Sequence, residues 1–94
     1  MTKKIEILVG EETMVRAGKE EFSLGNPDYA GIWGGGQLVI QYREINDETN
    51  QAVERLALLM DSSSRLDTGS EMFGMRPMYV IHLEYKPNVV ILQR

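Results

Sequence analysis

Apolar and polar residues alternate along the first quarter of the chain, and turn-forming residues separate the alternating segments. Residues 4–9 alternate in this way and stop at a glycine, which is typical of a strand that ends in a turn. Residues 13–17 can pair back onto this strand as a hairpin, and residues 20–24 offer a short third strand. The next residues, Gly25 to Asp28, are dense in turn formers, so we expect a surface loop there.

The period of the pattern changes in the middle of the chain. Residues 37–45 form the clearest predicted strand, with apolar side chains on one face and polar ones on the other. Asn46 or Asp47 can then accept hydrogen bonds from free backbone N–H groups, which predicts the start of a helix. The helix presents an apolar stripe at i, i+3, i+4 and i+7, formed by Val53, Leu56, Ala57 and Met60. After the helix we expect a connection that runs to about Arg76.

The C-terminal part of the sequence predicts a hairpin. Residues 77–86 alternate, and Pro87-Asn88 makes a tight link to the apolar segment 89–92. The whole order predicts one α+β domain over residues 1–94, with a small antiparallel sheet of four or five strands and one amphipathic helix packed on one face.

A second set of apolar side chains lies on the other face of these predicted strands. Its members are Leu8, Val39, Val80, Val90 and Leu92. One helix covers only one side of a sheet, so something else should cover this set. Either the chain curls into a half-barrel and buries these residues itself, or a second copy or a partner protein covers them.

Composition narrows the classes of function. The chain has 94 residues with a formal net charge of −4 and 43% hydrophobic residues, which suits one small core. With no cysteine, it can form neither disulfides nor thiolate metal sites, and it has no cysteine nucleophile. The longest apolar stretches are far shorter than the roughly 20 residues of a membrane helix. We therefore expect a soluble, cytoplasmic protein that makes no membrane contact.

The charges do not favour nucleic-acid binding. Lysines and arginines are scattered from Lys3 to Arg94 without a run, and aromatic residues do not interleave with them. The mild acidity is instead compatible with a basic protein partner.

Catalytic and metal signatures are weak. His82 is the only histidine, and Glu84 lies two residues further on the same predicted strand face, as on any exposed strand. The adjacent carboxylates in Glu11-Glu12 and Glu20-Glu21 point to opposite strand faces, so neither pair is an acid–base dyad. We expect no catalytic site, cofactor or metal, and hence no enzyme.

The most unusual stretch is Gly31-Ile32-Trp33-Gly34-Gly35-Gly36. A phosphate-binding loop would need a following Lys and Ser or Thr at a helix start, whereas these glycines run into Gln37 and a strand. One interpretation is a bulge or wide turn in which Trp33 packs over a glycine. An exposed Trp33 would instead be an interaction anchor. The rival function is a small-molecule or nucleotide-binding domain that uses the Gly34–Gly36 backbone.

A methionine-rich segment is the second candidate contact region. Residues 72–78 contain three of the six methionines in a predicted loop. The segment either covers the core or forms an adaptable binding loop. As contact anchors we take five hydrophobic side chains, namely Trp33, Tyr42, Met72, Phe73 and Met75.

Two short segments look like the phage-encoded uracil-DNA glycosylase inhibitor family. They are Gly36-Gln37-Leu38-Val39-Ile40-Gln41 and Glu84-Tyr85-Lys86-Pro87, with Val90 and Gln93 beyond. The resemblance covers about a dozen of the 94 residues. It implies a small acidic inhibitor without catalytic activity, which imitates DNA and blocks a DNA-binding repair enzyme.

The chain also departs from the family pattern. The family follows the second glutamine with a functional Glu, where Tyr42 stands here, and its acidic helix is replaced by one that contains Arg55. The broader expectation does not depend on the resemblance. We expect a small non-catalytic protein–protein interaction module, with a phage-type inhibitor of a host protein as one form of it. A homodimer is a further option for covering the second apolar face.

Overall fold

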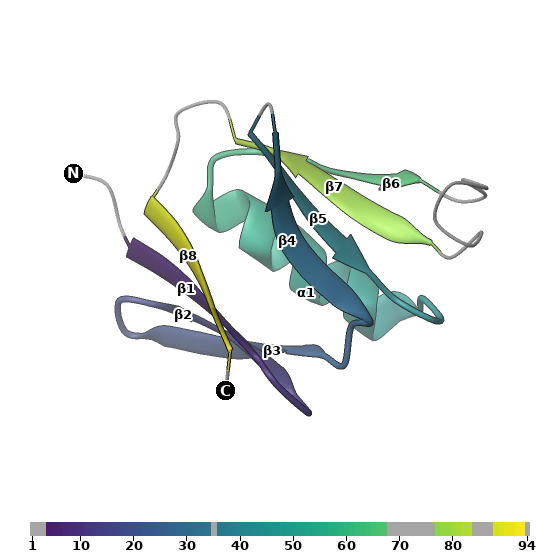
Figure 1. Cartoon of the computed structure of the whole chain (residues 1–94), viewed down its shortest axis with the longest axis horizontal. Coiled ribbons are helices and arrows are strands. Elements are labelled where there is room, and N and C mark those ends of the chain that lie inside the picture. Colours follow the sequence, from purple (N-terminus) through teal and green to yellow (C-terminus); the bar gives the residue numbers. More distant parts are fainter. Residues whose placement is uncertain (1–3, 35, 68–76, 84–87, 94) are drawn as a thin grey trace.

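The computed structural model describes residues 4–34, 36–67, 77–83 and 88–93. Within these residues the chain is an α+β protein with eight strands in two four-stranded sheets and one helix (Figure 1). The elements are β1 (Lys4–Val9), β2 (Thr13–Ala17), β3 (Glu20–Gly25), β4 (Tyr29–Trp33), β5 (Gln37–Gln41), α1 (Asp47–Leu59), β6 (Ser64–Asp67), β7 (Met78–His82) and β8 (Asn88–Gln93).

The first sheet has the strand order β3-β2-β1-β8. Strands β1, β2 and β3 pair antiparallel, as their patterns predicted, whereas β8 lies parallel to β1. The sheet is therefore mixed, and β8 does not form the expected hairpin with residues 77–86. An alternating pattern shows which face of a strand is buried but does not name the neighbouring strand, so the sequence could not reveal this long-range pairing.

The second sheet has the strand order β4-β5-β7-β6 and is antiparallel throughout. The sequence predicted one sheet and missed two of these strands. Strand β4 was not predicted, and it includes the start of the 31–36 stretch that we interpreted as a bulge or wide turn, because glycine masks the alternation. Strand β6 lies in the expected connection and is short, with Leu66 as its one apolar residue.

Helix α1 begins where the sequence predicts. The Asn46 side chain accepts the Thr49 N–H at 2.9 Å, and the Thr49 hydroxyl accepts the Asn46 N–H at 2.9 Å, which is a reciprocal capping box. The acidic residues Asp47 and Glu48 lie in the first turn, at the positive end of the helix dipole. The helix is too short and polar to cross a membrane, and no other helix occurs among the described residues.

A single buried cluster joins the inner faces of both sheets to the helix. The predicted stripe on α1 is buried, and it packs with Ile5, Ile7, Val15 and Leu24 of the first sheet and with Leu38, Ile40 and Ile81 of the second. Figure 1 shows α1 behind the second sheet, with the first sheet below. Because the core uses these inner faces, each sheet keeps an outer face that the helix does not cover.

Candidate functional site

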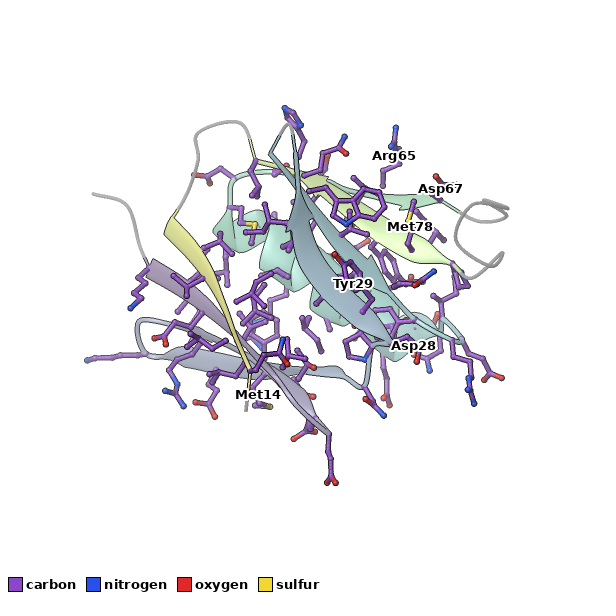
Figure 2. All side chains as sticks on the ribbon, viewed as in Figure 1. Met14, Asp28, Tyr29, Arg65, Asp67 and Met78 are labelled. Atoms are coloured by element: carbon purple, nitrogen blue, oxygen red, sulfur yellow. The ribbon has the colours of Figure 1, made fainter. Side chains whose placement is uncertain are left out.

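Side chains on the outer face of the second sheet form three rows across its strands. The first row contains Tyr29, Gln41, Met78 and Asp67. The second contains Gly31, Val39, Val80 and Arg65, and the third contains Trp33, Gln37 and His82. Figure 2 shows Tyr29, Met78 and Asp67 on one side of this sheet, while Met14 lies beneath the first sheet. Strands β4 and β5 contribute no charged residue to this face.

An aromatic pair bridges the glycine of the second row. The Trp33 indole N–H donates a hydrogen bond to the Tyr29 hydroxyl at 3.0 Å. The Tyr29 ring lies over Gly31, where any side chain would collide with it. A strand glycine leaves backbone and neighbouring side chains uncovered, and an aromatic ring placed over it restores that cover. Gly31 is therefore required for the pair to close.

Beneath the pair lies an apolar floor. Val39, Met78 and Val80 are buried, and Trp33 packs against them. A cleft of about 220 Å³ opens beside them, lined by Tyr29, Trp33, Val39, Gln41 and Met78. Tyr29 is 44% exposed at its rim. The volume suits one apolar side chain of another molecule, and the Gln41 amide supplies a polar group.

Among the described residues, charged side chains lie beside the cleft, and none of them lines it. Asp67 lies next to Met78 and Arg65 next to Val80, both from the edge strand β6 (Figure 2). His82 is exposed at the end of β7, opposite Gln37. Among the described residues, no group of three or more His, Asp or Glu side chains could hold a metal ion.

The five predicted contact anchors fall in different places. Trp33 is half-buried in the aromatic pair. Met72, Phe73 and Met75 lie outside the described residues. Tyr42 is a core residue, 3% exposed, so little of its surface can contact a partner.

The sequence pattern could not place Tyr42 because an aromatic residue at a strand end suits either surface or core. Its hydroxyl donates to the Leu24 carbonyl at 2.5 Å, and its ring meets Tyr79 edge-on with centroids 5.7 Å apart. This hydrogen bond connects the two sheets. Burial, and secondarily the neighbouring Tyr79, raises the pKa of the Tyr42 hydroxyl above its ordinary value.

Gly34 and Gly36 lie in the turn between β4 and β5. Gly36 has a φ of +77°, a conformation that favours glycine, and its carbonyl accepts the Leu83 N–H at 2.7 Å. Gly34 is exposed, and Gly35 lies outside the described residues. The hairpin accounts for glycine at position 36 without a ligand.

Tyr29 was not among the predicted site residues. A signal was present, because Tyr29, Gly31 and Trp33 are spaced by two residues and so share one strand face. Met78 was also missed as part of the floor, because its burial depends on a strand pairing between segments far apart in the chain.

A second, larger cleft lies at the start of the helix. It has a volume of about 530 Å³ and includes three carboxylates, from Glu12, Glu44 and Glu48, with Tyr42 also in its lining. These acidic side chains are all exposed.

No protein-family model matches this chain, and no curated protein or solved structure matches it. Its function is therefore argued from the geometry of its surfaces.

Proposed function

We propose that the chain is a small non-catalytic protein-binding module whose contact surface is the outer face of the second sheet. The observation that carries the proposal is the Tyr29–Trp33 pair, held together by a hydrogen bond beside a cleft with an apolar floor. Tryptophan and tyrosine dominate the energetics of protein interfaces because they bury a large area at little cost in side-chain entropy.

The lining of the cleft supports binding rather than catalysis. Among the described residues that line it, Tyr29 is the one with an ionisable side chain, and none is a carboxylate, histidine or lysine of the kind that acts as a general acid or base. The Trp33 indole N–H already donates to the Tyr29 hydroxyl oxygen. The cleft offers another molecule an apolar surface.

The partner that suits this face inserts one apolar side chain between Tyr29 and Met78. With a net charge of −4, the chain favours a partner with basic residues around that anchor, because opposite charges raise association rates and discriminate against other proteins. Asp67, in the same row as Met78, is placed to meet such a residue.

Differential affinity capture from a lysate of the native host tests the proposal. The bait is used as wild type, as Trp33→Ala, and as Met14→Ala, the last altering an apolar side chain on the outer face of the first sheet. Circular dichroism first confirms that all three are folded. We expect one protein to be captured stoichiometrically by wild type and Met14→Ala but at least tenfold less by Trp33→Ala, since central interface aromatics contribute about 2 kcal/mol or more. Equal capture by all three variants would contradict the proposal.

The inhibitor function implied by the sequence resemblance is a special case of this proposal. The chain is then an inhibitor of uracil-DNA glycosylase, and the test is uracil excision from a labelled oligonucleotide with increasing amounts of chain. Full inhibition at equimolar chain would support the special case. Unchanged excision would remove it and leave the broader binding proposal to the capture experiment.

A further inference from the structure

Two backbone hydrogen bonds at the ends of the β5–β7 pair reveal which residues of β5 face which neighbour. The Leu83 N–H donates to the Gly36 carbonyl at 2.7 Å, and the Tyr42 N–H donates to the Pro77 carbonyl at 3.1 Å. Hydrogen-bonding residues alternate along an antiparallel strand, so the even-numbered residues of β5 bond to β7. The odd-numbered residues therefore bond to β4.

The same alternation identifies the backbone groups at the open edge of β4. Its residues Tyr29, Gly31 and Trp33 lie opposite the odd-numbered residues of β5 and bond to them. Ala30 and Ile32 therefore direct their N–H and C=O groups away from β5. Within the described part of the chain β4 pairs with no other strand, so these groups form a free edge.

This edge lacks the features that normally prevent strand pairing. Strand β4 contains no charged residue and no proline, whereas the edge strand β3 begins with two glutamates and the edge strand β6 carries Arg65 and Asp67. Ile32 is 45% exposed on β4. An uncharged edge can meet a copy of itself without repulsion between like charges.

We propose that β4 pairs antiparallel with β4 of a second copy of this chain, around a two-fold axis at Gly31. In this register, Ala30 lies opposite Ile32 of the second copy, and each such pair exchanges two hydrogen bonds. The two symmetric pairs satisfy all the outward groups of Ala30 and Ile32. The result is one continuous sheet across both copies.

The residues of β4 suit this register and no neighbouring one. At the axis, Gly31 faces its own copy in a pair that makes no hydrogen bonds, where Cα atoms approach to about 4.5 Å. Moving the axis to Ala30 would need the Asp28 N–H, which already donates to the Gln41 carbonyl at 2.7 Å. Moving it to Ile32 would use the backbone of Gly34, which lies in the turn.

Side chains are also complementary about this axis. On the outer face Tyr29 lies beside Trp33 of the second copy, and on the inner face the exposed Ile32 lies beside Ala30 of the second copy. Isologous contacts of this kind, in which residue i meets j and j meets i, are typical of two-fold dimers. The two aromatic clefts then lie side by side on one surface.

The mass in solution tests the dimer, and two matched variants locate it. Light scattering of the wild type should give twice the chain mass of 10.7 kDa. The Ile32→Lys variant places a charge on the β4 edge and should weaken dimerisation at least tenfold. Its control is Leu66→Lys on the opposite edge of the same sheet, where Leu66 is 42% exposed, and this variant should remain dimeric.

Hydrogen exchange identifies the strand that pairs. The amides of Ala30 and Ile32 should be protected in the dimer and exchange rapidly after dilution or in Ile32→Lys. A wild-type mass of one chain at all concentrations up to about 1 mM would overturn the inference. A second result would also overturn the inference. In that result Ile32→Lys stays dimeric, whereas Leu66→Lys, or Leu92→Lys on the edge strand β8, becomes monomeric.

The dimer and the proposed function can fail separately. Ile32 lies on the inner face, so Ile32→Lys keeps the outer cleft and should still capture the partner protein. If Ile32→Lys is monomeric but still captures the partner, the edge of β4 forms the dimer and the outer cleft binds the partner independently of it.

Discussion

The outer faces of the two sheets differ although both sheets have four strands and share one core. On the first sheet, Glu6, Arg16 and Glu21 form a row of charges, and the Arg16 guanidinium contacts the Glu21 carboxylate at 3.2 Å. The second sheet has no charge on β4 or β5 and carries the hydrogen-bonded Tyr29–Trp33 pair. Arg16 and Glu21 in this charged row are about half exposed to water, whereas the cleft beside the Tyr29–Trp33 pair offers apolar surface that another protein can bury. The difference lies in the side chains, not in the fold.

The largest expected effect tests whether the two sheets share one core. Leu56 of α1 is fully buried in the cluster to which both sheets contribute, so Leu56→Ala should lower the free energy of unfolding by about 2 to 5 kcal/mol in one cooperative urea transition. Leu58, on the same helix, is 73% exposed, and Leu58→Ala should change the free energy of unfolding by less than about 0.5 kcal/mol. Two separate transitions, one for each sheet, would contradict the shared core.

The next largest effect is a pH dependence of the free energy of unfolding, which arises from the Tyr42 hydroxyl that donates to the Leu24 carbonyl. Burial favours the neutral Tyr42 hydroxyl and raises its pKa, so the folded state resists its ionisation. The stabilisation is fully present below the unfolded pKa of about 10 and is lost as pH rises further, by about 1.4 kcal/mol per pH unit. Urea unfolding between neutral pH and pH about 11 measures this loss. The Tyr42→Phe variant should be less stable at neutral pH and should lack this part of the alkaline decline; parallel pH curves for the two proteins would refute the assignment.

A smaller effect tests the hairpin that positions the aromatic pair. Gly36 has a positive φ, and an added Cβ would lie 3.3 Å from the Leu83 carbonyl oxygen, so Gly36→Ala should cost about 1 to 2 kcal/mol. Gly34 has open space around it, and Gly34→Ala should be neutral or slightly stabilising. Thermal unfolding of both variants measures the contrast. Equal melting temperatures would show that the turn does not need glycine at position 36.

The smallest effect concerns the charged face of the first sheet. Arg16 and Glu21 are each about half exposed, so Arg16→Ala should lower the free energy of unfolding by less than about 1 kcal/mol. The variant should also capture the partner as well as the wild type does. A loss of capture would move the contact surface to the first sheet.

The sequence predicted the elements whose pattern is local. The capped start of α1 at Asn46 and the buried stripe of the helix are confirmed, as are the first three strands. The strand predicted over residues 37–45 is confirmed as far as Gln41, where β5 ends. A capping box and a 3.6-residue period involve only neighbours in the chain, so one sequence suffices to recognise them.

The sequence could not determine the arrangement of the strands. Strand β8 alternates in the same way whether it pairs with β7 or with β1, and the choice depends on the whole core. Strand β4 was hidden because Gly31 interrupts its apolar pattern, although the Tyr29 ring covers that glycine. Because this strand was not recognised, the sequence did not show that Tyr29 lies on the same strand face as the candidate Trp33.

The most direct test of the contact surface observes the NMR signal of Trp33, the one tryptophan in the sequence. Trp33 is labelled with fluorotryptophan, and its fluorine NMR resonance is recorded while lysate of the native host is added. We predict that the resonance shifts or broadens with the wild type and with Met14→Ala, and stays unchanged with Tyr29→Ala, because a bound protein covers the aromatic pair. A resonance that responds equally in all three proteins, or in none, would contradict a partner site on the outer face of the second sheet.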